Sequence, residues 1–134
     1  MKTIVTFKQQ ILKSALFILV TAASFAANAG TTPAKPSSFT ATVNNNNTNR
    51  VDLKWSTETE TNLSHFIVER STDGTTFSNA ALVFAYGNTS AKSDYAFADN
   101  ISKVQTGTVY YRISLIANDG ANQASDIRII RIEK

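Results

Sequence analysis

The sequence beyond residue 37 predicts an all-β fold, a seven-stranded antiparallel β-sandwich. Short runs of alternating apolar and polar residues recur there, separated by turn residues such as Asp73-Gly74 and Asn118-Asp119-Gly120. No stretch in this region has the i, i+3, i+4 apolar spacing of an amphipathic helix. Alternation with period two is typical of strands that turn one face to a core and the other to water.

Two runs carry the prediction most clearly. Arg50–Ser56 alternates charged residues with Val51, Leu53 and Trp55, so the apolar set is expected to face the core. Thr108–Ala117 is the longest run, and we expect Tyr111 from it to meet Trp55 between the sheets. The other five strands are predicted at Ser38–Val43, His65–Ser71, Ala81–Tyr86, Asp94–Ala98 and Ala124–Ile132.

Two irregular places are expected along these strands. The polar run from Asn44 to Asn49 predicts a turn after the first strand. In the last strand Ile129 and Ile130 are adjacent apolar residues, which interrupts the alternation. Because a slip of one residue exchanges the two faces of a strand, we expect a bulge or bend at this pair.

The N-terminus has the pattern of an export signal. Lys2, Lys8 and Lys13 form a positive segment, residues 15–23 are apolar, and Ala27-Asn28-Ala29 has the small-residue pattern of a cleavage site. We therefore expect a cleavable signal peptide at 1–29, a flexible leader at 30–37 and the sandwich domain at 38–134. An uncleaved signal anchor is the alternative.

Composition limits the function further. The chain has 13 Lys and Arg against 10 Asp and Glu, and loss of the three signal lysines leaves the two signs equal. A neutral chain lacks the basic face that nucleic-acid binding requires. With no cysteine, neither a disulfide nor a zinc–thiolate site nor a thiol nucleophile is possible. No second apolar run is long enough to span a membrane after cleavage.

The order of motifs resembles the fibronectin type III or immunoglobulin-like sandwich, and more closely a variant found in exported proteins of Bacteroidetes-type bacteria. The resemblance covers about residues 50 to 132 and implies a fold and an extracytoplasmic setting, not a reaction. The residues that carry it are Trp55, Thr59-Glu60-Thr61-Asn62, Phe66, Val68-Glu69-Arg70-Ser71, Asp73-Gly74, Phe77, Gly87-Asn88, Tyr95, Phe97, Asp99, Gly107, Tyr110-Tyr111-Arg112 and Asp119-Gly120.

Candidate catalytic or metal-binding residues are few. His65 is the only histidine and has no nucleophile motif beside it, so an ordinary histidine at a strand end is favoured over a catalytic relay. Glu58 and Glu60 lie close together in sequence and are candidates for acid–base work or calcium binding. We favour a structural role instead, in which Glu60 and Asn62 brace the loop by bonding backbone N–H groups. No catalytic residue, cofactor or metal is expected.

Two arginines are expected to have structural roles. Arg112 is placed as a cross-strand partner of Glu69. Arg70 follows the inward register of its strand, so we expect it at the sandwich edge with a buried stem and a hydrated head.

Several residues are candidates for a binding surface. Phe84, Tyr86 and Tyr110 could form an aromatic platform for a sugar, although filling the core or covering a sheet edge is the favoured role. The loops that contain Asn45 and Asn46 and the turn with Asp119 are further candidates, and the sequence leaves open which loops share an end. The stretch Ala80–Tyr86 is apolar and uncharged, which predicts a poorly protected edge strand.

These observations predict an exported, non-catalytic β-sandwich that binds a protein or glycan, mediates adhesion or acts as a spacer, in the periplasm or at the cell surface. A strand-pairing assembly or structural module of the envelope is the alternative, and a small hydrolase is a remote one. The expected partners are an unknown protein or glycan outside the cytoplasm, with no nucleic acid, and the expected state is a monomer or a weak homo-oligomer.

Overall fold

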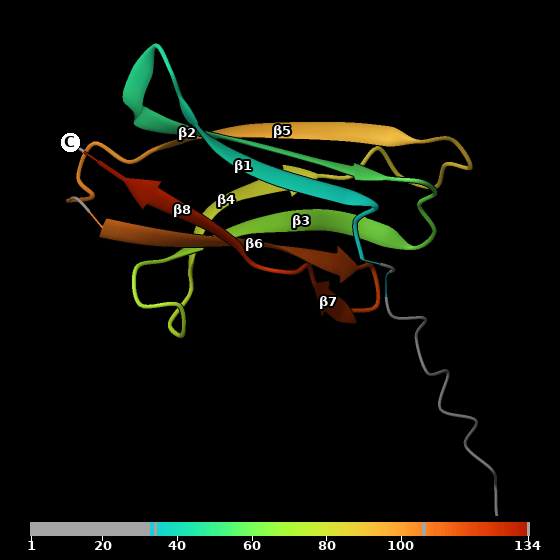
Figure 1. Cartoon of the computed structure of the whole chain (residues 1–134). Helices are drawn as coiled ribbons and strands as arrows, with labels where there is room; N and C mark the ends of the chain where they lie inside the picture. Colours follow the sequence, from blue (N-terminus) through green and yellow to red (C-terminus); the bar gives the residue numbers. More distant parts are fainter. Residues whose placement is uncertain (1–32, 34, 106, 134) are drawn as a thin grey trace, which may run out of the picture.

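A computed structural model describes residues 33, 35–105 and 107–133, and the predicted signal peptide at 1–29 lies outside this part (Figure 1). All the regular structure in the described part is β, and none of it forms a helix that could cross a membrane. The strands are β1 (Ser38–Asn44), β2 (Asn47–Thr57), β3 (Leu63–Ser71), β4 (Ser78–Phe84), β5 (Ser93–Asn100), β6 (Gly107–Ala117), β7 (Asn122–Ala124) and β8 (Arg128–Ile132).

The strands form two antiparallel sheets that face each other (Figure 1). The smaller sheet has the order β1-β2-β5, and the larger has the order β4-β3-β6-β7, with β8 also pairing with β6. β7 pairs with the last part of β6 and β8 with its first part. This two-layer architecture confirms the predicted sandwich.

The core lies between the sheets and is built around Trp55 of β2 and Tyr111 of β6, as the alternation predicted. Both side chains are almost completely buried. The Trp55 ring meets Phe66 edge-on at 5.4 Å and stacks on Tyr95 at 5.6 Å between centroids, so both sheets supply rings to one cluster. The other buried apolar side chains of this core are Phe39, Val51, Leu53, Leu63, Val68, Ile101, Val109, Ile113, Leu115, Ile130 and Ile132.

The predicted bulge at Ile129-Ile130 is wrong. Tyr110 pairs with Ile129 and Val109 with Ile130 in unbroken register, so Ile129 faces solvent and Ile130 faces the core. The interruption comes earlier, between β7 and β8, where Ser125 exchanges two hydrogen bonds with the Ile113 backbone. The Ser125 hydroxyl accepts from the Ile113 N–H, so a side-chain oxygen replaces a backbone carbonyl in one hydrogen bond between the strands. This replacement divides the predicted last strand into β7 and β8.

Other strand boundaries also differ from the prediction, and two of them have a clear local cause or consequence. The first turn is only Asn45-Asn46, because the Asn44 side-chain oxygen accepts the N–H groups of Asn46 and Asn47 and lets β2 start there. β4 ends at Phe84, two residues earlier than predicted, and its pairing with β3 shifts between Val68 and Glu69.

The loops fall into two groups at opposite ends of the sandwich. The hairpin tip at Asn45-Asn46 and the loop 72–77 lie at the end where β2 and β4 begin, on the left in Figure 1. The loops 58–62, 85–92 and 118–121 lie at the other end, beside the start of β3. Antiparallel strands therefore separate Asp119 from Asn45 and Asn46 by the length of the domain.

Candidate binding surface

A row of large apolar side chains projects from β4 and the residues that follow it. Leu82, Phe84 and Tyr86 alternate along the chain with partly buried neighbours and are 53%, 75% and 75% exposed. The strand's alternate residues Ala81 and Val83 pack against the core instead. Of the two favoured sequence interpretations, Phe84 and Tyr86 therefore do not fill the core, but they do lie at the edge of a sheet, because β4 is the outer strand of the larger one.

Tyr86 is held in place although its ring is exposed. The ring stacks on that of Tyr95, with 4.9 Å between centroids and 24° between planes, and the Tyr86 N–H donates to the Tyr95 hydroxyl at 3.0 Å. Tyr95 in turn stacks on Trp55. A continuous stack of three rings thus leads from the core to the surface, so the outermost ring is oriented before any ligand arrives.

The Tyr95 hydroxyl is fixed by a buried carboxylate. It donates to Glu60 Oε1, which also accepts from Thr57 Oγ1 at 2.7 Å. Glu60 is only 2% exposed, and its backbone forms a two-way bridge to Thr89. Burial, with the hydrogen bond to Glu60, raises the pKa of Tyr95 to about 12. Glu60 therefore braces the loop as predicted, but its carboxylate accepts from hydroxyl groups rather than from backbone N–H groups.

Asn62 ties the three loops at this end together. Its N–H donates to Asn88 Oδ1 at 2.9 Å, its side chain donates to Asp119 Oδ2 at 3.2 Å, and its carbonyl accepts from the Asn118 N–H. Its φ of 58° lies in the left-handed region, which asparagine tolerates better than most residues. Asp119 is thereby brought to the same end of the domain as Tyr86.

An open hollow of about 420 Å³ lies between two of these loops. It is lined by hydroxyl and amide side chains and by Glu60, the carboxylate that accepts from Tyr95. The hollow and the Tyr86 ring are therefore both linked to the Tyr95 hydroxyl. Its lining residues are Thr59, Glu60, Thr61, Asn88, Thr89 and Ser90.

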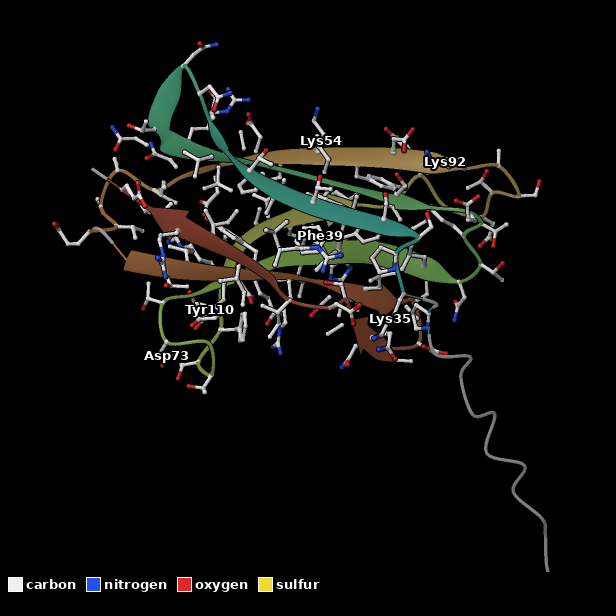
Figure 2. The ribbon with its side chains drawn as sticks, viewed as in Figure 1. Lys35, Phe39, Lys54, Asp73, Lys92 and Tyr110 are labelled. Atoms are coloured by element: carbon white, nitrogen blue, oxygen red, sulfur yellow. The ribbon has the colours of Figure 1, made fainter. Side chains whose placement is uncertain are left out.

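The other candidate residues lie elsewhere. Tyr110 is on the outer face of the larger sheet, where its ring lies against Gly74 at the opposite end (Figure 2). Asn45 and Asn46 are exposed at the hairpin tip of that end. The three aromatic residues considered as one platform are thus divided between two places.

His65 and Glu58, which were considered for chemistry, lie apart from any catalytic arrangement in the described part of the chain. His65 Nδ1 lies 3.0 Å from the Ser64 hydroxyl, its neighbour in sequence, and Glu58 is exposed. Within the described part of the chain, no group of three or more His, Asp or Glu side chains could hold a metal ion. The arrangement offers ring stacking and hydrogen bonding rather than convergent titratable groups.

Both arginine expectations can be compared with the structure. Arg112 forms a bidentate pair with Glu69, at 2.7 and 3.1 Å, and its guanidinium lies 4.2 Å from the Phe77 ring centroid, so the predicted cross-strand pair is confirmed. The head of Arg70 is not simply hydrated, because Nη1 donates to buried Asp99 at 2.7 Å.

Sequence reasoning missed how Tyr95 and Asn62 contribute to this end of the domain. Tyr95 was predicted only as a residue of the strand Asp94–Ala98, and its bond to the Tyr86 backbone depends on how the edge of one sheet lies over the other. Asn62 was assigned a bracing role without its partners Asn88 and Asp119. The signal available was the run Thr57 to Asn62, whose side chains favour turns.

The two sheets, their antiparallel order and the Trp55-centred core define a fibronectin type III-like β-sandwich. A solved structure described as an Fn3-like protein from Clostridium thermocellum has this fold, with a TM-score of 0.51 and 22% sequence identity. The match covers 76% of this chain and 95% of that one. No family model matches the sequence, and no curated protein matches it.

Proposed function

We propose that this chain is a non-catalytic module that binds a glycan outside the cytoplasm, with Tyr86 as its stacking platform. The observation that carries the proposal is the exposed Tyr86 ring held on Tyr95, whose hydroxyl donates to Glu60 in the lining of a hollow of hydroxyl and amide groups. The C–H face of a sugar ring packs on an aromatic face, while its hydroxyls need neutral donors and acceptors at the rim. Thr59, Asn88 and Ser90 supply such groups.

The extracytoplasmic setting is proposed from the N-terminal sequence. A positive segment, a short apolar segment and a small-residue cleavage pattern precede the sandwich. The resemblance to exported fibronectin type III variants favours the same setting. Periplasm and cell surface are both consistent with these features.

A glycan array probed with the protein purified after export tests the proposal. Tyr86→Ala removes the platform, and we expect it to weaken retention on the recognised glycan at least tenfold, comparable with the roughly 1–3 kcal/mol that an aromatic side chain contributes when a nucleic-acid base stacks on it. Tyr110→Ala is the matched control, because it removes the same side chain at the other end of the domain and should leave binding within twofold. Unchanged thermal unfolding of Tyr86→Ala shows that the fold is intact.

Two outcomes would contradict the proposal. One is that the array retains no protein at any glycan. The other is equal retention of the parent protein and Tyr86→Ala. A protein captured from the envelope in a Tyr86-dependent way would keep the binding surface but replace the glycan as its partner.

A further inference from the structure

β4 is the outer strand of the larger sheet and presents main-chain groups to solvent. It pairs with β3 on one side, and no described strand pairs with its other side. The Ala85 N–H donates to the Ser64 carbonyl, so the backbone of Ala85 faces β3. Because this direction alternates in an antiparallel ladder, the N–H and C=O groups of Leu82 and Phe84 face away from β3.

Tyr86 shows where this free edge ends. Its N–H also points away from β3, and it donates to the Tyr95 hydroxyl of the opposite sheet. The side chain of Tyr95 therefore occupies the position that an additional strand would take at Tyr86. The unoccupied part of the edge is centred on Val83.

The outer strands of the smaller sheet, β1 and β5, carry features that protect an edge, whereas the part of β4 after its register shift, from Ala81 to Phe84, carries none. On β1, the Phe39 carbonyl accepts from Arg128 Nε at 2.7 Å, and β8 lies alongside that strand. β5 contains Asp94 and Asp99, with Lys92 close to its start. The sequence from Phe77 to Ala91 has neither a charged residue nor a proline. Charge and proline are the usual means by which a protein prevents pairing at an edge.

We propose that β4 pairs antiparallel with β4 of a second copy of this chain. Around a two-fold axis at Val83, Leu82 of one copy lies opposite Phe84 of the other, and the two residues exchange their main-chain hydrogen bonds. The symmetric pairing provides about four such bonds. It also places each aliphatic side chain beside an aromatic one on the same face, the kind of cross-strand pair that stabilises sheets.

The uncharged edge and its exposed apolar row are complementary to themselves, which favours a second copy as the partner. Two uncharged strands meet without like charges opposite each other and without desolvating an ion. The apolar row is exposed on each copy, and a two-fold pairing covers part of both rows with each other. The two larger sheets would join into one continuous sheet across the axis.

Sedimentation velocity over a concentration series tests the pairing, with the protein purified after export. We expect a reversible monomer–dimer equilibrium, and Leu82→Lys should raise its dissociation constant at least tenfold. Ile129→Lys is the matched control: Ile129 is also a strand residue with its side chain 67% exposed, on β8 of the same sheet, and its replacement should change the constant less than twofold. A single species of monomer mass at millimolar concentration overturns the proposal.

Hydrogen exchange of single amides separates strand pairing from contact through side chains alone. The Leu82 and Phe84 amides should become protected as concentration rises, by at least tenfold in exchange rate. The Val83 and Ala85 amides already face β3 and should not change. A dimer that leaves the Leu82 and Phe84 amides unprotected, or that Leu82→Lys does not weaken, overturns the proposal. Glycan binding and dimer formation can be tested separately, because Tyr86→Ala removes the stacking ring but leaves in place the Leu82 and Phe84 backbone that would pair in the dimer.

Discussion

Tyr111 donates its phenolic hydrogen to Asp99 Oδ2 at 2.7 Å and so joins the centre of the larger sheet to an outer strand of the smaller one. The same oxygen accepts from Arg70 Nη1 at 2.7 Å. Tyr111 and Asp99 are buried and Arg70 is partly exposed, and burial together with Asp99 raises the pKa of Tyr111 far above its ordinary value. One carboxylate thus connects β5 to two neighbouring strands of the opposite sheet.

Tyr111→Phe should lower the free energy of unfolding by about 1.5–3 kcal/mol, the usual contribution of a hydrogen bond to a charged group. The substitution keeps the ring in the core and removes only the donor to Asp99. Tyr110→Phe, one residue earlier and half-buried, is the control and should change stability by less than about 0.5 kcal/mol. Urea unfolding of both variants measures the difference, and equal losses would show that the Tyr111 hydroxyl does not stabilise the fold.

The Glu69–Arg112 pair should make the protein less stable in acid. The hydrogen bonds from Arg112 hold the pKa of Glu69 below its ordinary value of 4.5, so the native state binds its proton less readily than the unfolded state. The stabilisation is complete above pH 4.5 and is lost as pH falls from there through the lower pKa of the native state. In urea titrations at several pH values, Glu69→Gln should be less stable at neutral pH and should lose less on acidification. A slope identical to that of the parent would contradict this role.

Tyr95 should make the protein less stable in alkali. Its pKa of about 12 in the native state exceeds the ordinary 10.0, so the native state keeps this proton longer than the unfolded state does. The contribution is complete below pH 10 and is lost as pH rises from 10 to 12. Tyr95→Phe should flatten this part of the stability curve and abolish one phenolate absorbance step near pH 12. A Tyr95 that titrates at its ordinary value would contradict its burial against Glu60.

Gly74→Ala should be more costly than Gly120→Ala. Both glycines have positive φ, 78° and 85°, so both replacements strain the backbone by about 1 kcal/mol. At Gly74 the new Cβ would also lie 3.1 Å from the Tyr110 ring, whereas nothing lies within 4 Å at Gly120. In thermal unfolding, the midpoint temperature of Gly74→Ala should be lower than that of Gly120→Ala. Combining Gly74→Ala with Tyr110→Ala should remove the excess loss, and an excess that persists would contradict the contact.

The sequence predicted the core because period-two alternation states directly which residues share a face. Val51, Leu53 and Trp55 alternate with polar or charged residues, and no other secondary structure puts all three on one side. The break before β8 was not predictable in this way. It depends on the Ser125 hydroxyl replacing a backbone group, and the adjacent Ile129 and Ile130 gave a stronger but misleading signal.

The candidate site was only partly predictable. The run Ala80–Tyr86 predicted an outer strand, which β4 is. The exposure of Phe84 and Tyr86 follows instead from the face of the sheet on which they lie, and alternation did not indicate that face because both registers of residues 81–86 are apolar. The ends at which loops lie were accessible in principle, because successive antiparallel connections alternate between ends. That rule separates the Asn45-Asn46 turn from the turn with Asp119. Contacts between sheets, such as Arg70 with Asp99, join residues far apart in sequence and had no sequence signal.

The fluorescence of the single tryptophan tests the central claim most directly, namely that two sheets close around Trp55 and carry the Tyr86 platform on its ring stack. The account predicts a blue-shifted emission that acrylamide quenches poorly and that shifts red with the main unfolding transition. Red-shifted emission from the native protein, quenched as readily as that of free tryptophan, would contradict the sandwich and the surface built on it.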